Sequence, residues 1–466
     1  MRRLGKKYRN WLENLVIKNN SFDIQKNGVV RLYPASSQSH MPGSLWAATA
    51  SPRVSRPALA QKIAADAVVI GAGLTGLRTA LGLADAGMSV AVLEGKAVGY
   101  GASGRSGGQC NPMWRATPDQ LCQRLGEKTA EMLVALTLSA TDDLMADVNR
   151  YGVSCDFVQN GWVQAAHCNA SASNLEHLGD AWNSVGAKIC LLDRLATQKR
   201  SGSPDYAMSL FHPNGGHVHP LSLTRGFAEA AERLGVSIFE DTSAVGIQKN
   251  GSQWTVATPQ GSVVTKRVVF ATNAYSDGLW PGLRETIVPM VTTILATQPL
   301  DAATRSQVLP GNVTIADTRR AIYYARYDRD FRLVFGCVGS VDDVAALGGL
   351  GRLRRGLGTT FPVLKDASAS FTWSGRIAVT RDMMPRLYEP ESGIFAGLGY
   401  SGRGILMTSV MARALVKRIL GAPESELPFP ISPIERFPLQ PIVRRLVPYA
   451  TPAMELRDKL DTWIGR

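Results

Sequence analysis

Glycines at positions 71, 73 and 76 form the pattern GxGxxG, and their surroundings indicate what the pattern can bind. The motif, Gly71-Ala72-Gly73-Leu74-Thr75-Gly76, follows an apolar run at 67–70 and begins a small, apolar stretch at 75–86. A glycine turn between a buried strand and a helix offers backbone N–H groups to phosphates. Glu94 ends a second apolar run, where a carboxylate can accept hydrogen bonds from a ribose. A ligand-free structural turn is the alternative, but the combination predicts a dinucleotide site.

A second glycine-rich segment, residues 99–109, follows the second apolar run. Its small side chains would let the backbone lie against a flat ring and its phosphates, whereas a flexible surface loop is the alternative. The contacts predicted from this segment are Gly101, Ala102, Ser103, Gly104, Arg105, Gly107 and Gly108.

This segment resembles the GASGRxGG loop of the D-amino-acid oxidase superfamily of FAD enzymes, most closely the branch with the gamma-glutamylputrescine oxidases. Other similar segments follow in the same order, at 46–50, 216–220, 242–245, 271–275, 373–375, 379–382 and 397–405. The resemblance covers about 40–435. It implies FAD as cofactor, with the backbone near Val245 at the adenine.

The glycine-rich segment Gly397–Ile405 resembles the second flavin motif of that family. A helix beginning near Ile405 would point its positive end at the flavin and stabilise the charge that develops on reduction. The resemblance implies contacts from Gly402, Arg403, Gly404 and Ile405. Some relatives tether FAD through a His in the first loop or a Cys before the second motif. This chain has neither, and Cys110 beside the first loop is expected to be packed, so we expect noncovalent FAD.

The substrate side is expected on strands that the resemblance places over the flavin ring. Tyr323, Tyr324, Arg326 and Trp373 lie there, with ordinary half-buried sheet positions as the alternative. Tyr324, Trp373 and Arg403 are the candidates for direct action on the substrate. His217 and His219 are possible polar contacts, although structural roles are the more common reading. Leu406 stands where some amino-acid-oxidising relatives have a Lys, which favours a longer amine or a carboxylate bound elsewhere.

The expected reaction is oxidation of the C–N bond of a small amine or amino-acid-like substrate, such as a gamma-glutamylputrescine-like or other N-substituted amine. Hydride transfer to flavin N5 would give an imine that water hydrolyses. Oxygen or another acceptor would take the electrons. A dehydrogenase of the same fold that reduces a quinone or carrier protein is one alternative, and a non-enzymatic FAD-binding or membrane-associated subunit is another.

These motifs require a particular set of elements around them. The fold class expected is α/β, a Rossmann-type FAD-binding domain interleaved with a substrate domain built on a mostly antiparallel sheet. The expected divisions are an N-terminal extension at 1–39, FAD-binding segments at 40–115, 205–285 and 372–435, substrate segments at 116–204 and 286–371, and a tail at 436–466. Asp328-Arg329-Asp330 predicts a hairpin. The Pro-rich residues 423–452 are expected to wrap the surface.

Composition limits the remaining possibilities. The chain has 466 residues, 45% of them hydrophobic, which excludes general disorder. Eight of its bases and two of its acids lie in 1–40, where an amphipathic pattern allows weak membrane-surface contact through residues 1–31 or simply an added, dispensable helix. The other bases are scattered, so no nucleic-acid partner is expected. Six widely spaced cysteines predict no metal site and indicate a cytoplasmic protein.

Overall fold

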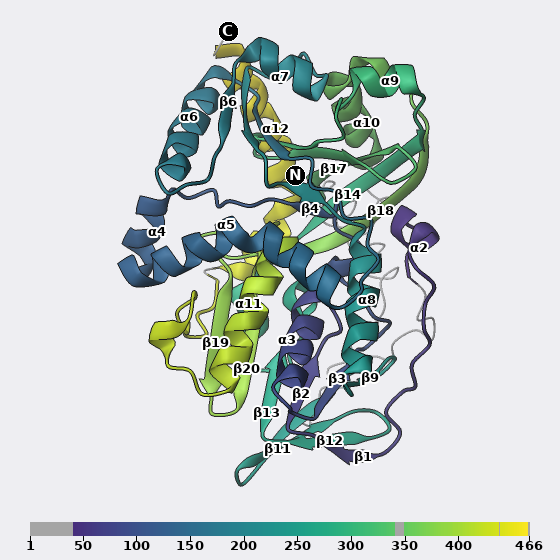
Figure 1. Cartoon of the computed structure of the whole chain (residues 1–466), viewed down its shortest axis with the longest axis vertical. Helices are drawn as coiled ribbons and strands as arrows, with labels where there is room; N and C mark the ends of the chain where they lie inside the picture. Colours follow the sequence, from purple (N-terminus) through teal and green to yellow (C-terminus); the bar gives the residue numbers. More distant parts are fainter. Residues whose placement is uncertain (1–40, 341–348, 438, 465–466) are drawn as a thin grey trace, which may run out of the picture. The chain divides into compact units, whose positions relative to one another are not determined.

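The computed structural model describes residues 41–340, 349–437 and 439–464 (Figure 1). Within these residues the strands form four sheets of six, eight, four and two strands. The predictions made for residues 1–40, including the amphipathic pattern, lie outside the described residues.

The six-stranded sheet carries the first glycine motif. Its order is β19-β20-β13-β2-β3-β9, and every pairing is parallel except that of β19 with β20. All residues of β2 and β3 are buried, as a parallel sheet covered on both faces requires. The strands are β2 (Ala67–Ile70), β3 (Val90–Leu93), β9 (Ser237–Phe239), β13 (Arg267–Phe270), β19 (Arg386–Glu391) and β20 (Ile394–Leu398).

Three helices cover one face of this sheet: α3 (Leu74–Asp85), α8 (Pro220–Arg233) and α11 (Gly404–Ile419) (Figure 1). They lie side by side, with α3 in contact with both neighbours. The other face packs against a small sheet of β1 (Lys62–Ala64), β12 (Ser262–Thr265), β11 (Gln253–Ala257) and β10 (Gly246–Asn250). Alternate residues of β2 therefore enter two separate apolar clusters.

The eight-stranded sheet has the order β18-β14-β17-β16-β15-β5-β7-β6, and only the β15–β5 pairing is parallel. The mostly antiparallel sheet was expected. The predicted hairpin is also found, since Tyr327 pairs with Leu333 across it. The strands are β5 (Trp162–Ala166), β6 (Cys190–Leu192), β7 (Met208–His212), β14 (Val288–Pro299), β15 (Thr314–Asp317), β16 (Tyr323–Tyr327), β17 (Arg332–Ser340) and β18 (Ala369–Val379).

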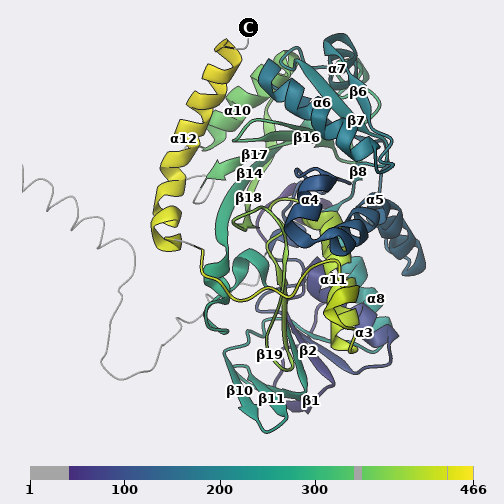
Figure 2. The ribbon, with the colours of Figure 1, turned by 90° about the vertical axis from the view of Figure 1, so that its left-hand side faces the viewer.

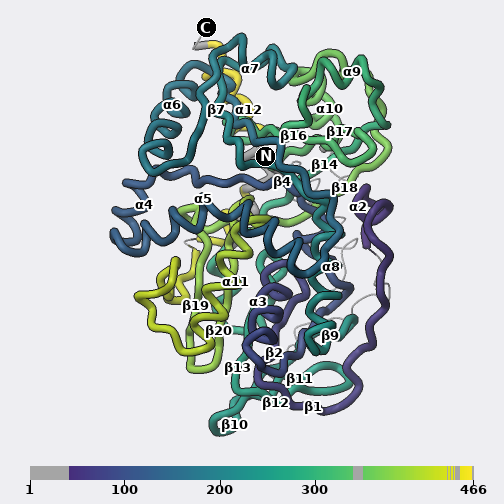
Figure 3. The backbone as a smooth tube through the Cα atoms, in the orientation of Figure 1, coloured from purple at the N-terminus to yellow at the C-terminus, as the bar shows by residue number. Residues whose placement is uncertain are grey.

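The remaining elements surround these sheets. The short strands β4 (Gln109–Cys110) and β8 (Gly216–His217) pair with each other. The tube in Figure 3 follows the chain from α4 through α5 beneath α6. The other helices are α2 (Leu45–Thr49), α4 (Pro118–Leu125), α5 (Glu127–Arg150), α6 (Asn169–Asn183), α7 (Arg194–Ser201), α9 (Ala302–Gln307), α10 (Gly349–Thr360) and α12 (Gln440–Ile464).

The backbone pairing of two strands differs from the domain boundaries expected from the sequence. β7 lies within 205–285 and most of β18 within 372–435, both assigned to the FAD-binding part, yet both strands belong to the eight-stranded sheet. A strand belongs to the sheet that satisfies its N–H and C=O groups, which local sequence does not specify.

The C-terminal expectation also needs correction, because 440–464 forms helix α12 (Figure 2). Pro448 and Pro452 within it disfavour a helix, since each lacks an N–H donor. The segment 453–463 is rich in strong helix formers. Its acids also pair with the body of the protein: Arg320 lies 2.6 Å from Asp458 and 2.7 Å from Asp461.

Candidate active site

A cavity of about 640 Å³ lies between the carboxyl ends of strands β2 and β3 and the eight-stranded sheet. The first residues of α3 and α11 line it, as do side chains from β5, β14 and β16. Ligands of open parallel sheets bind at the carboxyl ends of the strands. This cavity is therefore the candidate active site.

The first glycine motif forms the start of α3 at the cavity. Gly71 has a φ of +106°, which favours glycine, and its N–H donates to the Leu93 carbonyl over 2.8 Å. A Cβ on Gly76 would lie 2.0 Å from the Gly71 carbonyl oxygen, so helix and strand require glycine there. The Ser103 hydroxyl accepts from the Leu74 N–H over 2.9 Å. The second loop thus holds the helix start, which still presents its positive end to the cavity.

Glu94 lies at the carboxyl end of β3, at the other side of the motif. Its two oxygens accept from the N–H groups of Ala72 (2.9 Å) and Lys96 (3.0 Å). Burial raises the pKa of this carboxyl to about 7, against the lowering effect of the two backbone donors. Each carboxylate oxygen keeps a free lone pair for a ligand hydroxyl.

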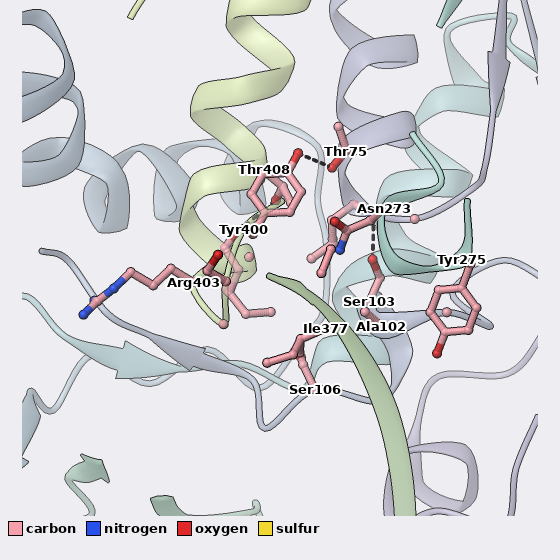
Figure 4. A pocket seen from close by; sticks show the side chains of 18 of the residues that line it. Thr75, Ala102, Ser103, Ser106, Asn273, Tyr275, Ile377, Tyr400, Arg403 and Thr408 are labelled. Carbon is pink, nitrogen blue, oxygen red and sulfur yellow. Dashed lines mark hydrogen bonds between the residues drawn. The ribbon is translucent and has the colours of Figure 1, made fainter. Parts of the chain in front are cut away.

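The second glycine motif brings the start of α11 to the same cavity. Tyr400 and Thr75 share a 2.7 Å hydrogen bond that joins it to α3, and Figure 4 shows this bond beside Arg403 and Thr408. The Asn273 side chain accepts from the Gly399 N–H over 2.9 Å. Two helix starts thus face one space, where both favour negative charge.

Arg403 precedes α11 and is half-buried. Its guanidinium donates to the Met113 carbonyl and lies 5.8 Å from the centre of the Trp162 ring. Burial, and then the nearby Arg115, lower its pKa to about 9. Burial also lowers the pKa of Arg115, which Asp317 partly offsets. Arg115 lines the cavity, and no residue of the described segments donates to or accepts from its guanidinium.

The cavity wall also contains unsatisfied polar atoms. Ser106 Oγ, Asn111 Oδ1, Trp162 Nε1 and Gln164 Oε1 are buried and have no hydrogen-bond partner among the described residues. Such an atom costs about 1–3 kcal/mol unless a ligand or water satisfies it. This end of the cavity therefore has unused capacity to bind a polar ligand.

The structure brings most of the predicted site residues together. The predicted residues that line the cavity are Gly71, Gly73, Leu74, Thr75, Glu94, Gly101, Ala102, Ser103, Gly107, Gly108, Tyr324, Gly402, Arg403, Gly404 and Ile405. Tyr324 hydrogen-bonds Thr292 over 2.8 Å, and burial raises the pKa of its hydroxyl.

Two predicted contacts need correction. Val245 does not line the cavity, because its N–H donates to the Ala257 carbonyl over 2.8 Å and its side chain is exposed; Ser243 and Ala244 line it instead. Trp373 is packed behind the glycine loop, where its Nε1 donates to the Arg105 carbonyl over 2.9 Å. A direct catalytic role for Trp373 is therefore not supported.

Four other residues that were predicted to contact the cofactor support the loops of the cavity from behind and do not line it. Ala72 donates to Glu94, and Gly76 permits the close helix–strand approach described above. Gly104 would place a Cβ 2.2 Å from the Gly99 carbonyl oxygen, and Arg105 donates to the Tyr100 carbonyl over 2.7 Å. These residues shape the loops rather than line the cavity.

The remaining polar candidates on this side are structural. His219 caps α8 by accepting from the Ser222 N–H over 3.1 Å, and burial lowers its pKa to about 3. His217 is buried in β8, and its pKa is also lowered by burial. Arg326 donates to the carbonyls of Gly107 and Val218, each over 2.8 Å. None of the three lines the cavity.

Two further positions fit their expected packing. Tyr323 stacks on Phe335 on the opposite face of the sheet from Tyr324. Leu406 is buried in the apolar core beside α11. Cys110 is fully buried, and burial raises its pKa to about 12, so it is not a reactive thiolate.

Several cavity residues were not anticipated: Asn111, Arg115, Trp162, Gln164, Met290, Thr292, Arg320, Ile322 and Met454. Trp162 and Gln164 are two apart on β5, as are Met290 and Thr292 on β14, so each pair shares one sheet face. The amino-acid sequence shows that each pair shares a sheet face. It does not show which face of the sheet lines the cavity.

One group of potential metal ligands lies elsewhere. Ligand atoms of His167, Asp458 and Asp461 lie within 4.8 Å of one another. Arg320 donates to both carboxylates, so an arginine already offsets part of their negative charge.

The fold and the cavity are those of a dinucleotide-binding protein with a second, larger sheet over the site, and comparison with known proteins identifies its family. Residues 66–418 match the family model "FAD dependent oxidoreductase" (DAO), so the chain belongs to this family. Gamma-glutamylputrescine oxidoreductase of Escherichia coli is 32% identical over 82% of this chain and 89% of its own. Probable oxidoreductase OrdL of Haemophilus influenzae is 33% identical over 79% and 86%.

Solved structures share the fold. Glycine oxidase from Geobacillus kaustophilus aligns with a TM-score of 0.68 at 21% identity, over 81% of this chain and 99% of its own. L-proline dehydrogenase from P. horikoshii aligns with a TM-score of 0.65 at 20% identity, over 80% and 98%. The expected fold class is confirmed.

FAD is the cofactor of the family, and the residues of this cavity fit it. Two helix starts favour its negative charges, glycines leave room for its backbone contacts, and Glu94 offers acceptors for a ribose. The chain is therefore an FAD-dependent oxidoreductase. No helix of the described residues is long and apolar enough to cross a membrane.

Proposed function

We propose that this enzyme oxidises the C–N bond of an amine that also carries a carboxylate away from the reacting nitrogen. Gamma-glutamylputrescine has this chemistry, and the E. coli relative is named for it. The observation that carries the proposal is the pair of arginines, Arg115 and Arg403, which both line the cavity and of which Arg115 lowers the pKa of Arg403.

Two like charges that line one cavity repel each other, and an anion between them would offset that repulsion. Within the described residues neither guanidinium has an ion pair, and only Asp317 is close enough to raise the pKa of Arg115. A ligand carboxylate would neutralise the pair and accept charge-assisted hydrogen bonds. Trp162 Nε1 would add a donor, while Asn111 Oδ1 and Gln164 Oε1 would accept from an amide or amine.

The cofactor would be held by the other half of the cavity. The start of α3 would meet the pyrophosphate, Glu94 the ribose, and the backbone of Ser243 and Ala244 the adenine edge. The start of α11, with Arg403, would face the pyrimidine side of the flavin. We expect noncovalent attachment, since the nearest thiol, Cys110, is buried in the core.

FAD, when bound, accepts a hydride from the carbon next to the substrate nitrogen, leaving an imine that water hydrolyses. The chain's own contribution is binding and orientation. Tyr324 keeps its proton because burial raises its pKa, so it would orient the substrate through its hydroxyl rather than remove a proton. Met290, Ile322 and Val338 would exclude water.

Anaerobic flavin bleaching tests this proposal. Gamma-glutamylputrescine should bleach the bound flavin at a concentration about 10–100-fold lower than 4-aminobutanoylputrescine, which keeps the amide and both amino groups and lacks only the carboxylate. That ratio corresponds to about 1.5–3 kcal/mol for a charged hydrogen-bonded contact. Equal sensitivity to both amines would contradict the carboxylate site, and no bleaching by any amine would contradict amine oxidation. If an amine does bleach the flavin, peroxide formation in air would distinguish an oxidase from a dehydrogenase.

A further inference from the structure

Helix α12 has an outward surface that the active site does not explain. Of the fifteen large apolar side chains exposed in the described part of the chain, six lie in or next to this one helix. They are Leu439 (69% exposed), Ile442 (52%), Leu446 (55%), Leu456 (61%), Leu460 (44%) and Trp463 (75%). Exposed apolar groups gathered in this way mark an interaction surface.

The spacing places these side chains on one stripe. Ile442 and Leu446 are four apart, Leu456 and Leu460 are four apart, and Trp463 follows three residues later. Residues separated by three and four positions share one helix face. Figure 2 shows α12 running along the edge of the ribbon, with its other side against strands β14 and β17. The stripe, defined by Ile442, Leu446, Leu456, Leu460 and Trp463, is therefore the outward face.

The charges of α12 are divided between the two faces. Its three acids are turned toward the protein: Asp458 and Asp461 bind Arg320, and Glu455 binds Arg352 of α10. The exposed charged side chains described on α12 are Arg457 and Lys459, both basic. The outward face thus combines an apolar stripe with positive charge and lacks an exposed acid among its described residues.

This combination decides between two occupants. A second copy of the chain would bury the stripe, but it would bring the same basic side chains together without acids to offset them. An anionic lipid surface matches both properties, because acyl chains accept the apolar groups and the headgroups attract Arg and Lys. Trp463, at the end of the stripe, is a residue type enriched at membrane–water interfaces. The net charge of +13 acts in the same direction.

We propose that the outward face of α12 binds the surface of an anionic lipid bilayer. The helix lies beyond residues 66–418, which match the family, so the property belongs to an addition to the family's core. Met454 of the same helix lines the active-site cavity. Binding through α12 would therefore hold the cavity next to the bilayer. This inference rests on α12 alone and does not depend on the proposed substrate.

Co-sedimentation of the full-length, FAD-loaded protein with vesicles provides the test. Vesicles of phosphatidylcholine with an equal share of phosphatidylglycerol should bind the protein, whereas phosphatidylcholine alone should bind it at least tenfold more weakly. The variant Leu456→Glu/Leu460→Glu/Trp463→Glu should lose at least tenfold of the binding to the anionic vesicles. The matched control Leu195→Glu, on α7 and 76% exposed, should bind like the wild type.

Three further measurements make the outcome decisive. An unchanged flavin spectrum and activity in free solution show that the α12 variant is folded, and if it is not, Arg457→Glu/Lys459→Glu replaces it with the same expectation. Full-length Leu12→Glu/Leu15→Glu should retain binding. If that variant loses binding while the α12 variant keeps it, the proposal is overturned. A wild-type dimer that becomes monomeric in the α12 variant by light scattering, with no vesicle binding, would assign the stripe to a second copy and also overturn it.

Discussion

The two walls of the active-site cavity are built on different principles. On the wall formed by the six-stranded sheet, most polar groups already have protein partners: Glu94 is held by two backbone N–H groups and Ser103 by Leu74. On the wall formed by the eight-stranded sheet, Trp162 Nε1 and Gln164 Oε1 have no partner in the described residues. Arg115, in the loop between β4 and α4 beside Asp317 of this sheet, has none either.

This difference indicates separate tasks. A wall whose loops are closed by their own hydrogen bonds offers fixed backbone geometry, which suits a large cofactor that stays bound. A wall with unused donors, acceptors and positive charge obtains its partners only from a ligand that enters and leaves. If the distinction is real, substitutions on the first wall should affect cofactor retention and stability, whereas those on the second should affect substrate affinity with FAD retained.

The largest effect is expected for Gly73→Val on the first wall. A Cβ there would lie 2.9 Å from Ser103 Oγ and would displace the hydroxyl that holds the start of α3. We expect complete loss of bound FAD, measured as the ratio of flavin to protein absorbance after purification. Gly43→Val is the control, because a Cβ on Gly43 meets nothing within 4 Å. If Gly73→Val retained a normal amount of flavin, the hypothesis that this wall binds the cofactor would be contradicted.

On the second wall, Arg115→Met should raise the KM for a carboxylate-bearing amine about 100-fold, because a charge-assisted contact of up to about 3 kcal/mol is lost. The flavin content should not change, and Arg115→Lys should recover part of the affinity. Steady-state kinetics and the visible spectrum measure the two quantities. Arg354→Met, at an exposed position of α10, is the control. Loss of FAD from Arg115→Met would break the distinction between the walls.

Glu94→Gln should change how stability depends on pH. Because the folded pKa of Glu94 is about 7 and its ordinary value 4.5, the folded protein retains a proton that the unfolded chain has released between these values. Wild-type stability from this group therefore falls as pH rises from 4.5 to 7. With both proteins free of FAD, the glutamine variant should gain about 3 kcal/mol relative to the wild type between pH 4.5 and pH 8, as measured by urea unfolding. Buried histidines titrate equally in both proteins and cancel. A pH-independent difference would contradict the buried carboxyl.

The smallest effect is expected for Tyr324→Phe, which removes a hydroxyl hydrogen-bonded to Thr292 at the cavity. We expect about a threefold fall in kcat/KM with unchanged flavin content, equivalent to about 0.7 kcal/mol. Tyr323→Phe is a matched control one residue away on the opposite face of β16, where the ring packs on Phe335. If both variants have the same kinetics, Tyr324 makes no substrate contact.

Much of the first wall was predictable because its information is local. A strand, a glycine turn, a helix and an acid within residues 67–94 predict a cofactor site, and the structure has each of these elements where expected. Val245 was expected at the cavity, whereas its neighbours Ser243 and Ala244 line it. Trp373 was expected to contact the substrate because its strand does reach the site, but its indole supports the Arg105 carbonyl instead.

The amino-acid sequence by itself determined the family, the cofactor and the main elements of both sheets, because apolar runs and glycine spacing act over a few residues. Only the tertiary structure decided which strand faces meet the cavity, that Arg115 and Arg403 come together, and that residues 440–464 form a helix with an outward apolar stripe. The reason is physical. Pairing of β7 and β18, enclosure of a guanidinium and ion pairs such as Arg320 with Asp458 all depend on contacts between residues far apart in the chain.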